Sequence, residues 1–137
     1  LLSLILVACW VPGVPSPLKT IRAEAVPTVA EIKAKTDRWL PENGRLASEN
    51  PSFAIVAGVR PFVLDNFSLA SFIRSGHPAG TDFLTRIRAR EFDVLIGFDP
   101  DTRWTPQGGA PVVLSDHYVA VDALGRRTIL TPRTNGR

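Results

Sequence analysis

Apolar and polar positions along the chain predict a series of short helices and strands, of which the first helix is the best marked. Thr28 and Glu31 have the spacing of a capping box, in which each side chain satisfies a free backbone amide of the first turn. Apolar residues follow at helical spacing, and Val29 and Ile32 are expected on the inward face. We therefore expect a helix over 29–39.

Three further helices are predicted from the placement of prolines, glycines and apolar residues. They are expected over 52–57, 67–75 and 83–90. Pro51 precedes the first and Gly76 ends the second, which are favoured positions for these two residue types. Thr81 or Asp82 is expected to cap the third.

Short apolar runs bounded by turn residues predict the strands. They are expected over 45–48, 61–64, 92–98, 117–122 and 127–131. The continuous apolar run of 92–98 favours a central strand that is covered on both faces, and the last two strands are expected to form a hairpin. The turn-rich segment 99–109 is expected to be an exposed loop. The order of elements predicts a small α/β domain of two or three layers, with a mixed sheet and a C-terminal antiparallel hairpin.

The start of the chain differs from the rest in composition. The run Leu1–Val11 is apolar and uncharged, but it is shorter than the roughly 20 residues that cross a bilayer as a helix. The sequence also contains no methionine, so we expect a piece of a longer or processed protein. The predicted divisions are the end of a transmembrane or signal segment (1–15), a proline-rich linker (16–27), a soluble α/β domain (28–133) and a tail (134–137).

Composition and charge exclude several classes of protein. The net charge is only +3, and arginines and lysines are interspersed with acids, so a nucleic-acid partner is not expected. Cys9 is the only cysteine and lies in the apolar run, which leaves the predicted soluble domain without a disulfide or a cysteine zinc site.

Two acid-amide pairs are the candidate ligand-binding residues. Glu49-Asn50 and Asp65-Asn66 each follow a predicted strand, and α/β sheets place ligand sites at the carboxyl ends of strands. Glu49 and Asp65 are therefore candidates for substrate binding. The alternative is that the amides act as helix N-caps, the more frequent role of asparagine immediately before a helix.

Other polar groups have less support as sites. His77, in a Gly-His-Pro context, is expected to be a surface loop residue, and His117 a residue at a strand edge that could pair with Asp116. The segment Asp99–Asp101 has alternating acids but lacks the glycine and the terminal glutamate of a calcium-binding loop.

The local sequence Leu6-Val7-Ala8-Cys9 resembles the lipobox of bacterial lipoproteins, in which the cysteine is acylated and becomes the new N-terminus. Under this alternative, Cys9 is a lipid anchor and the chain is a lipid-anchored extracytoplasmic binding protein. The competing interpretation is a cysteine near the end of a transmembrane helix.

Several short sequence segments, taken in their order along the chain, resemble the extracytoplasmic C-terminal domain of bacterial GT-C membrane glycosyltransferases, the protein-mannosyltransferase-like group. The resemblance covers about 29–132. It is carried by Leu46-Ala47-Ser48-Glu49-Asn50-Pro51, by Ala57-Gly58, by Arg60-Pro61 with Val63-Leu64-Asp65, by the 67–76 segment, by the passage 87–96, and by Tyr118 with Pro132.

The resemblance implies a larger parent protein in the inner or plasma membrane, with this domain outside the cytoplasm. The parent would transfer a sugar from a polyprenyl-phosphate donor to an extracytoplasmic acceptor. In that family the catalytic acid lies in an early extracytoplasmic loop, and no residue of this chain matches that motif. The domain itself is thus expected to be non-catalytic, a lid or an acceptor-side platform, and any divalent metal would belong to the catalytic part.

Overall fold

The computed structural model describes residues 26–63 and 65–134. The predicted membrane or signal segment 1–15 with Cys9, and most of the linker, therefore lie outside the described residues, as do Leu64 and the last three residues of the tail. The elements, in chain order, are α1 Val29–Trp39, β1 Leu46–Ser48, α2 Pro51–Val56, α3 Asn66–Ser75, α4 Pro78–Ala89, β2 Val94–Ile96, β3 Arg103–Trp104, β4 Val112–Val113, the 3₁₀ turn η2 Leu114–Asp116, β5 Tyr118–Leu124 and β6 Arg127–Pro132. Within these ranges no helix has the length and apolar character needed to cross a bilayer.

The main sheet is mixed, as predicted. Its four strands have the order β1-β2-β6-β5, in which β1 and β2 are parallel and the other neighbours are antiparallel. The predicted central strand is confirmed, because β2 lies between β1 and β6 and all three of its residues are buried. The C-terminal hairpin is also confirmed, with β5 at the sheet edge. A separate two-stranded sheet pairs β3 with β4.

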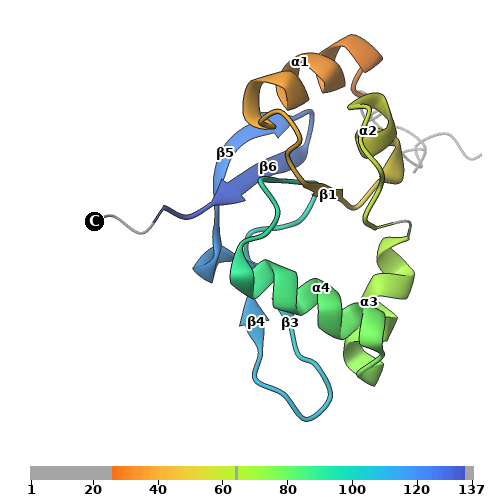
Figure 1. Cartoon of the computed structure of the whole chain (residues 1–137), viewed down its shortest axis with the longest axis vertical. Coiled ribbons are helices and arrows are strands. Elements are labelled where there is room, and N and C mark those ends of the chain that lie inside the picture. The colour runs from red at the N-terminus through yellow and green to blue at the C-terminus, as the bar shows by residue number, and fades with distance from the viewer. Residues whose placement is uncertain (1–25, 64, 135–137) are drawn as a thin grey trace, which may run out of the picture.

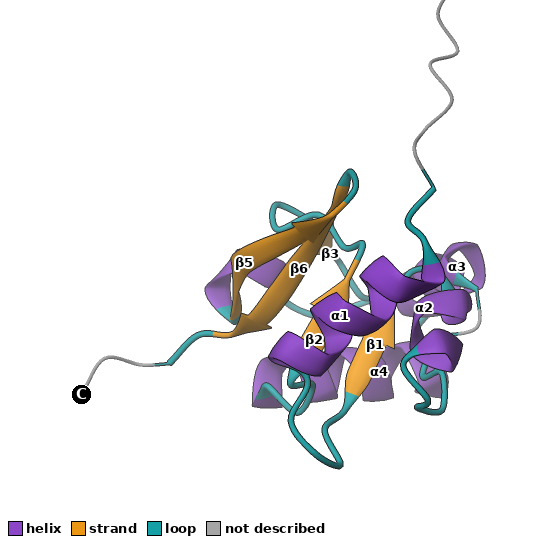
Figure 2. Cartoon of the chain, turned by 90° about the horizontal axis from the view of Figure 1, so that it is seen from above, coloured by secondary structure: helices purple, strands orange, loops and turns teal. Residues whose placement is uncertain are grey.

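Helices cover both faces of the main sheet, so the domain has three layers (Figures 1 and 2). Successive residues of a strand face opposite sides, and the two buried clusters follow this alternation. Val94 and Ile96 pack with α1 and α2, whereas Leu95 packs with α3, α4 and the segment around β3 and β4. The α3–α4 side carries the larger core and most of its aromatic rings.

Helix α1 has the predicted bounds, and Thr28 caps its N-terminus as expected. The Thr28 hydroxyl accepts a hydrogen bond from the Glu31 backbone N–H at 3.2 Å. Ile32 is buried, as predicted, but Val29 is 66% exposed and the inward position expected for it is wrong. Val29 is the first residue of the helix, and the two residues after it are exposed as well, so the buried face of α1 begins at Ile32.

Asp122 attaches the other end of α1 to the hairpin. Its carboxylate accepts hydrogen bonds from Lys35 Nζ at 2.6 Å and from Trp39 Nε1 at 3.0 Å. These two bonds, with one from the backbone N–H of Ala123, hold the pKa of Asp122 well below its usual range. These hydrogen bonds hold α1 against β5, the edge strand of the main sheet.

Three sequence expectations are wrong on the α3–α4 side. Residues 61–63 form no strand, because Pro61 has no N–H for a ladder and Phe62 and Val63 pack against the aromatic core. Helix α4 begins at Pro78 rather than after Thr81, because Pro is favoured at the first position of a helix.

The third correction concerns the segment 99–109, which is not wholly an exposed loop. Trp104 is 9% exposed and lies on β3, where it packs edge-on against Phe83 at 5.4 Å between ring centroids. Its indole supplies apolar area to the larger core. Turn residues on both sides of this short strand conceal it in the sequence.

Candidate functional site

Glu49 lies where the two parallel strands of the sheet end. Its backbone N–H donates to Ile96 O at 3.1 Å, which extends the pairing of β1 and β2 by one residue. Gly97 follows β2 on the neighbouring strand with a φ of +91°, a conformation that favours glycine. A Cβ at Gly97 would stand 3.3 Å from the Glu49 side chain, so bare backbone lies directly beside this carboxylate.

Two side chains from distant parts of the chain meet the Glu49 carboxylate. Asn66 Nδ2 donates to Glu49 Oε1 at 3.1 Å, and Arg127 Nη1 lies 3.7 Å from Glu49 Oε2. The Arg127 guanidinium also lies over the Phe53 ring, 5.5 Å from its centroid. We call Glu49, Asn66, Gly97 and Arg127 the Glu49 cluster. It joins one member of each predicted acid-amide pair.

Burial is the strongest influence on the charge of Glu49. It raises the pKa of Glu49 above the ordinary value, although Arg127 and the hydrogen bond from Asn66 act to lower it, and the nearby Asp99 raises it further. The Glu49 side chain is still 29% exposed. A partly desolvated carboxylate beside amide and guanidinium donors is well suited to bind the hydroxyl groups of a ligand.

The raised pKa predicts how Glu49 affects stability. Its folded-state pKa lies above the unfolded value, so the ionised form is disfavoured in the folded protein, and stability falls as the pH rises through this range. Glu49→Gln removes that charge and should raise the urea midpoint at pH 7, with a gain that shrinks as the pH falls towards 4.5. Urea titrations of both proteins across this pH range measure the effect. A lower midpoint for the variant at pH 7 would contradict it.

Only one of the two asparagines that could be helix N-caps has this role. Asn50 caps α2 as expected, because its side chain accepts from the Ser52 backbone N–H at 2.9 Å. In contrast, Asp65 and not Asn66 caps α3. Asp65 accepts from the backbone N–H of Ser68 and from its hydroxyl, which are the main causes of its lowered pKa. Asn66 is thereby free to reach Glu49.

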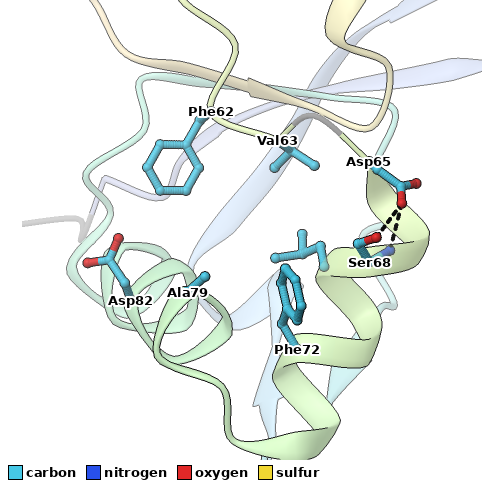
Figure 3. Close-up of a pocket in the computed structure, with 8 residues that line it drawn as sticks. Phe62, Val63, Asp65, Ser68, Phe72, Ala79 and Asp82 are labelled. Atoms are coloured by element: carbon cyan, nitrogen blue, oxygen red, sulfur yellow. Dashed lines mark hydrogen bonds between the residues drawn. The ribbon is translucent and has the colours of Figure 1, made fainter.

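Asp65 also lies on the rim of a pocket of about 390 Å³ between the 62–63 segment, α3 and α4 (Figure 3). The pocket is lined by Phe62, Val63, Asp65, Ser68, Leu69, Phe72, Ala79 and Asp82. The sequence does not predict this pocket, because 61–64 is expected to form a strand. Phe62 and Phe72, which are 40% and 38% exposed, line it together only in the fold, and no local signal in the sequence marks them.

Neither histidine belongs to the Glu49 cluster. His77 is the N-cap of α4, where Nδ1 accepts from the Ala79 backbone N–H at 3.2 Å and the ring stacks on Phe72. The pKa of His117 is lowered, first by burial and then by the nearby Arg90. His77 therefore serves as a helix cap, and His117 lies in a partly buried position near Arg90.

No three histidine, cysteine, aspartate or glutamate side chains within 26–63 and 65–134 are grouped so that they could hold a metal ion. In the predicted turn at 99–101, Asp99 Oδ1 accepts from the Asp101 backbone N–H at 2.9 Å, as in an ordinary turn.

Comparison of the sequence and structure with models of known protein families, with curated proteins and with solved structures gives no significant match.

Proposed function

We propose that this chain is the C-terminal extracytoplasmic domain of a polyprenyl-phosphate-dependent membrane glycosyltransferase, in which it serves as an acceptor-side platform. The single observation that carries the proposal is the Glu49 cluster at the carboxyl ends of β1 and β2. This is the edge at which α/β sheets hold ligands. The order of short sequence segments, from the Leu46–Pro51 segment to Tyr118 with Pro132, resembles that of such glycosyltransferases and supports this class of parent protein.

The proposed role of the Glu49 cluster is to bind hydroxyl groups of the acceptor. Glu49 accepts hydrogen bonds, while Asn66 and Arg127 supply donors on either side of it. Burial of the carboxylate strengthens such bonds, because fewer water molecules compete for it. We assign bond making and breaking to the membrane-embedded part of the parent, and to no residue of this chain.

The reading frame upstream of the Leu1 codon tests the identity of the parent. A frame that encodes many apolar spans, with an acidic residue in the first outside loop, is the expected result. A short basic leader that ends at Cys9 would instead make the chain a lipid-anchored binding protein. The role of Glu49 within the parent requires a transfer assay in membranes.

A further inference from the structure

Asn43 and Gly44 lie in the turn that joins α1 to β1. Asn43 is exposed and has a φ of +60°, a left-handed conformation that asparagine tolerates better than most residues. A Cβ at Gly44 would stand 2.8 Å from the carbonyl oxygen of Pro41, so the turn has room only for glycine there. Asparagine followed by glycine is also the dipeptide that deamidates most readily, because glycine has no side chain to hinder attack by its backbone nitrogen. The turn is thus built from a reactive pair of residues.

The three asparagines of the described residues differ in the two groups that deamidation needs, a free side-chain amide and a backbone N–H on the next residue. The Asn43 side chain has no hydrogen-bond partner among these residues, and a glycine N–H follows it. Asn50 is followed by Pro51, which has no N–H, and its side chain caps α2. The Asn66 side chain is held by its hydrogen bond to Glu49. Only Asn43 meets both conditions within 26–63 and 65–134.

One backbone hydrogen bond holds the turn closed. The Gly44 N–H donates to Pro41 O at 2.8 Å, and the nitrogen must leave this bond before it can attack the side chain of Asn43. An exposed turn opens at a low cost compared with the core, because water replaces the lost bond. The fold should therefore slow the reaction at Asn43 without preventing it.

We propose that Asn43 is a site of spontaneous deamidation in the folded protein and that the reaction yields isoaspartate together with aspartate. The Gly44 nitrogen forms a bond to Cγ of Asn43, the Cγ–Nδ2 bond breaks, and the amide leaves as ammonia with the proton from the Gly44 N–H. Water then opens the resulting succinimide ring. Attack at the side-chain carbonyl carbon gives aspartate, whereas attack at the backbone carbonyl carbon gives isoaspartate, in which the main chain runs through Cβ and Cγ.

Isoaspartate at position 43 should disturb the start of β1. Just after the turn, the Arg45 N–H donates to Asp93 Oδ2 at 2.8 Å, and Arg45 O accepts from the Asp93 N–H at 2.9 Å. These bonds attach the chain to the beginning of β2. Isoaspartate adds a methylene group to the main chain directly before them, whereas aspartate leaves the main chain unchanged and tolerates a positive φ. The isoaspartyl form should therefore be less stable than Asn43→Asp.

The proposal does not depend on the proposed glycosyltransferase role, because the Glu49 cluster takes no part in the reaction. Its test is incubation of the folded 137-residue chain in mildly alkaline buffer, followed by trypsin digestion and mass spectrometry. The peptide 39–45 contains Asn43, and its acid form should accumulate roughly five- to tenfold more slowly than in a sample unfolded in urea, the effect of one hydrogen bond that must open first. Asn135, which also precedes glycine, shows in each sample that the conditions permit the reaction.

The other asparagines supply the negative control. Asn50 and Asn66 lie together in the peptide 46–74, because trypsin does not cleave before Pro61, and both should remain amides in the folded chain. An unchanged Asn43 in a folded sample whose Asn135 has reacted would overturn the proposal. Conversion of Asn50 or Asn66 at the rate of Asn43 would overturn it as well.

Two variants separate the product from its effect. Asn43→Gly permits the same positive φ without an amide, so its peptide 39–45 should keep its mass. Asn43→Asp should have a urea midpoint close to that of the wild type, whereas the isoaspartyl chain, purified after incubation and identified against a synthetic peptide, should have a lower one. Equal midpoints for the isoaspartyl chain and Asn43→Asp would show that the added methylene leaves β1 in place and would contradict the proposed effect.

Discussion

Phe83→Ala should lower the free energy of unfolding by about 3–5 kcal/mol, a large part of the roughly 5–15 kcal/mol that a domain of this size possesses. Phe83 is fully buried at the centre of the larger core. Its ring contacts four other aromatic rings, those of Phe62, Phe92, Phe98 and Trp104. Removal of the ring would leave a cavity that these side chains, which come from separate segments of the chain, can fill only in part.

Urea unfolding followed by tryptophan fluorescence measures this loss, since Trp104 packs against Phe83. The matched control is Phe67→Ala, because Phe67 is 79% exposed and its loss should change stability by no more than about 0.5 kcal/mol. A loss below about 1 kcal/mol for Phe83→Ala would show that the aromatic core is not packed as described.

Gly80→Ala should destabilise the domain by about 1–3 kcal/mol or more, although alanine is the better helix former. Gly80 lies in α4, where a glycine costs roughly 1 kcal/mol relative to alanine by propensity alone. A Cβ at this position would stand 2.5 Å from the backbone nitrogen of Ile73 in α3. Because backbone cannot rotate away as a side chain can, the two helices would have to separate, and this steric term outweighs propensity.

The control for this prediction is Thr81→Ala, an exposed neighbour in the same helix. Its effect should stay within about 0.5 kcal/mol. A gain in stability for Gly80→Ala would mean that the helices do not cross at this glycine.

Elements with strong local signals could be predicted from the sequence. The Thr28 cap fixed the start of α1, and the continuous apolar run around Leu95 indicated a central strand. The predictions were wrong where tertiary contacts determine the local structure. Phe62 and Val63 have strand-like spacing but pack on α3 and α4, and nothing local distinguishes the two outcomes.

The candidate site was predictable in part. Glu49 was selected because it follows a strand, and it does lie at the carboxyl ends of the parallel pair. Asp65 was selected for the same reason, but residues 61–63 form no strand, and the position of Asp65 follows from its role as the cap of α3. Asn66 and Arg127 could not be assigned to Glu49, because only the fold brings these distant residues together.

The most direct test of the proposed function is glycosyl transfer from labelled polyprenyl-phosphate sugars in membranes that contain the full-length protein. Glu49→Ala should reduce transfer about tenfold at an unchanged protein level, as expected for the loss of one or two hydrogen bonds to the acceptor. Glu42→Ala, at an exposed residue of the turn before β1, should have no effect. No transfer by the wild-type protein, or equal transfer by wild type and Glu49→Ala, would contradict the account.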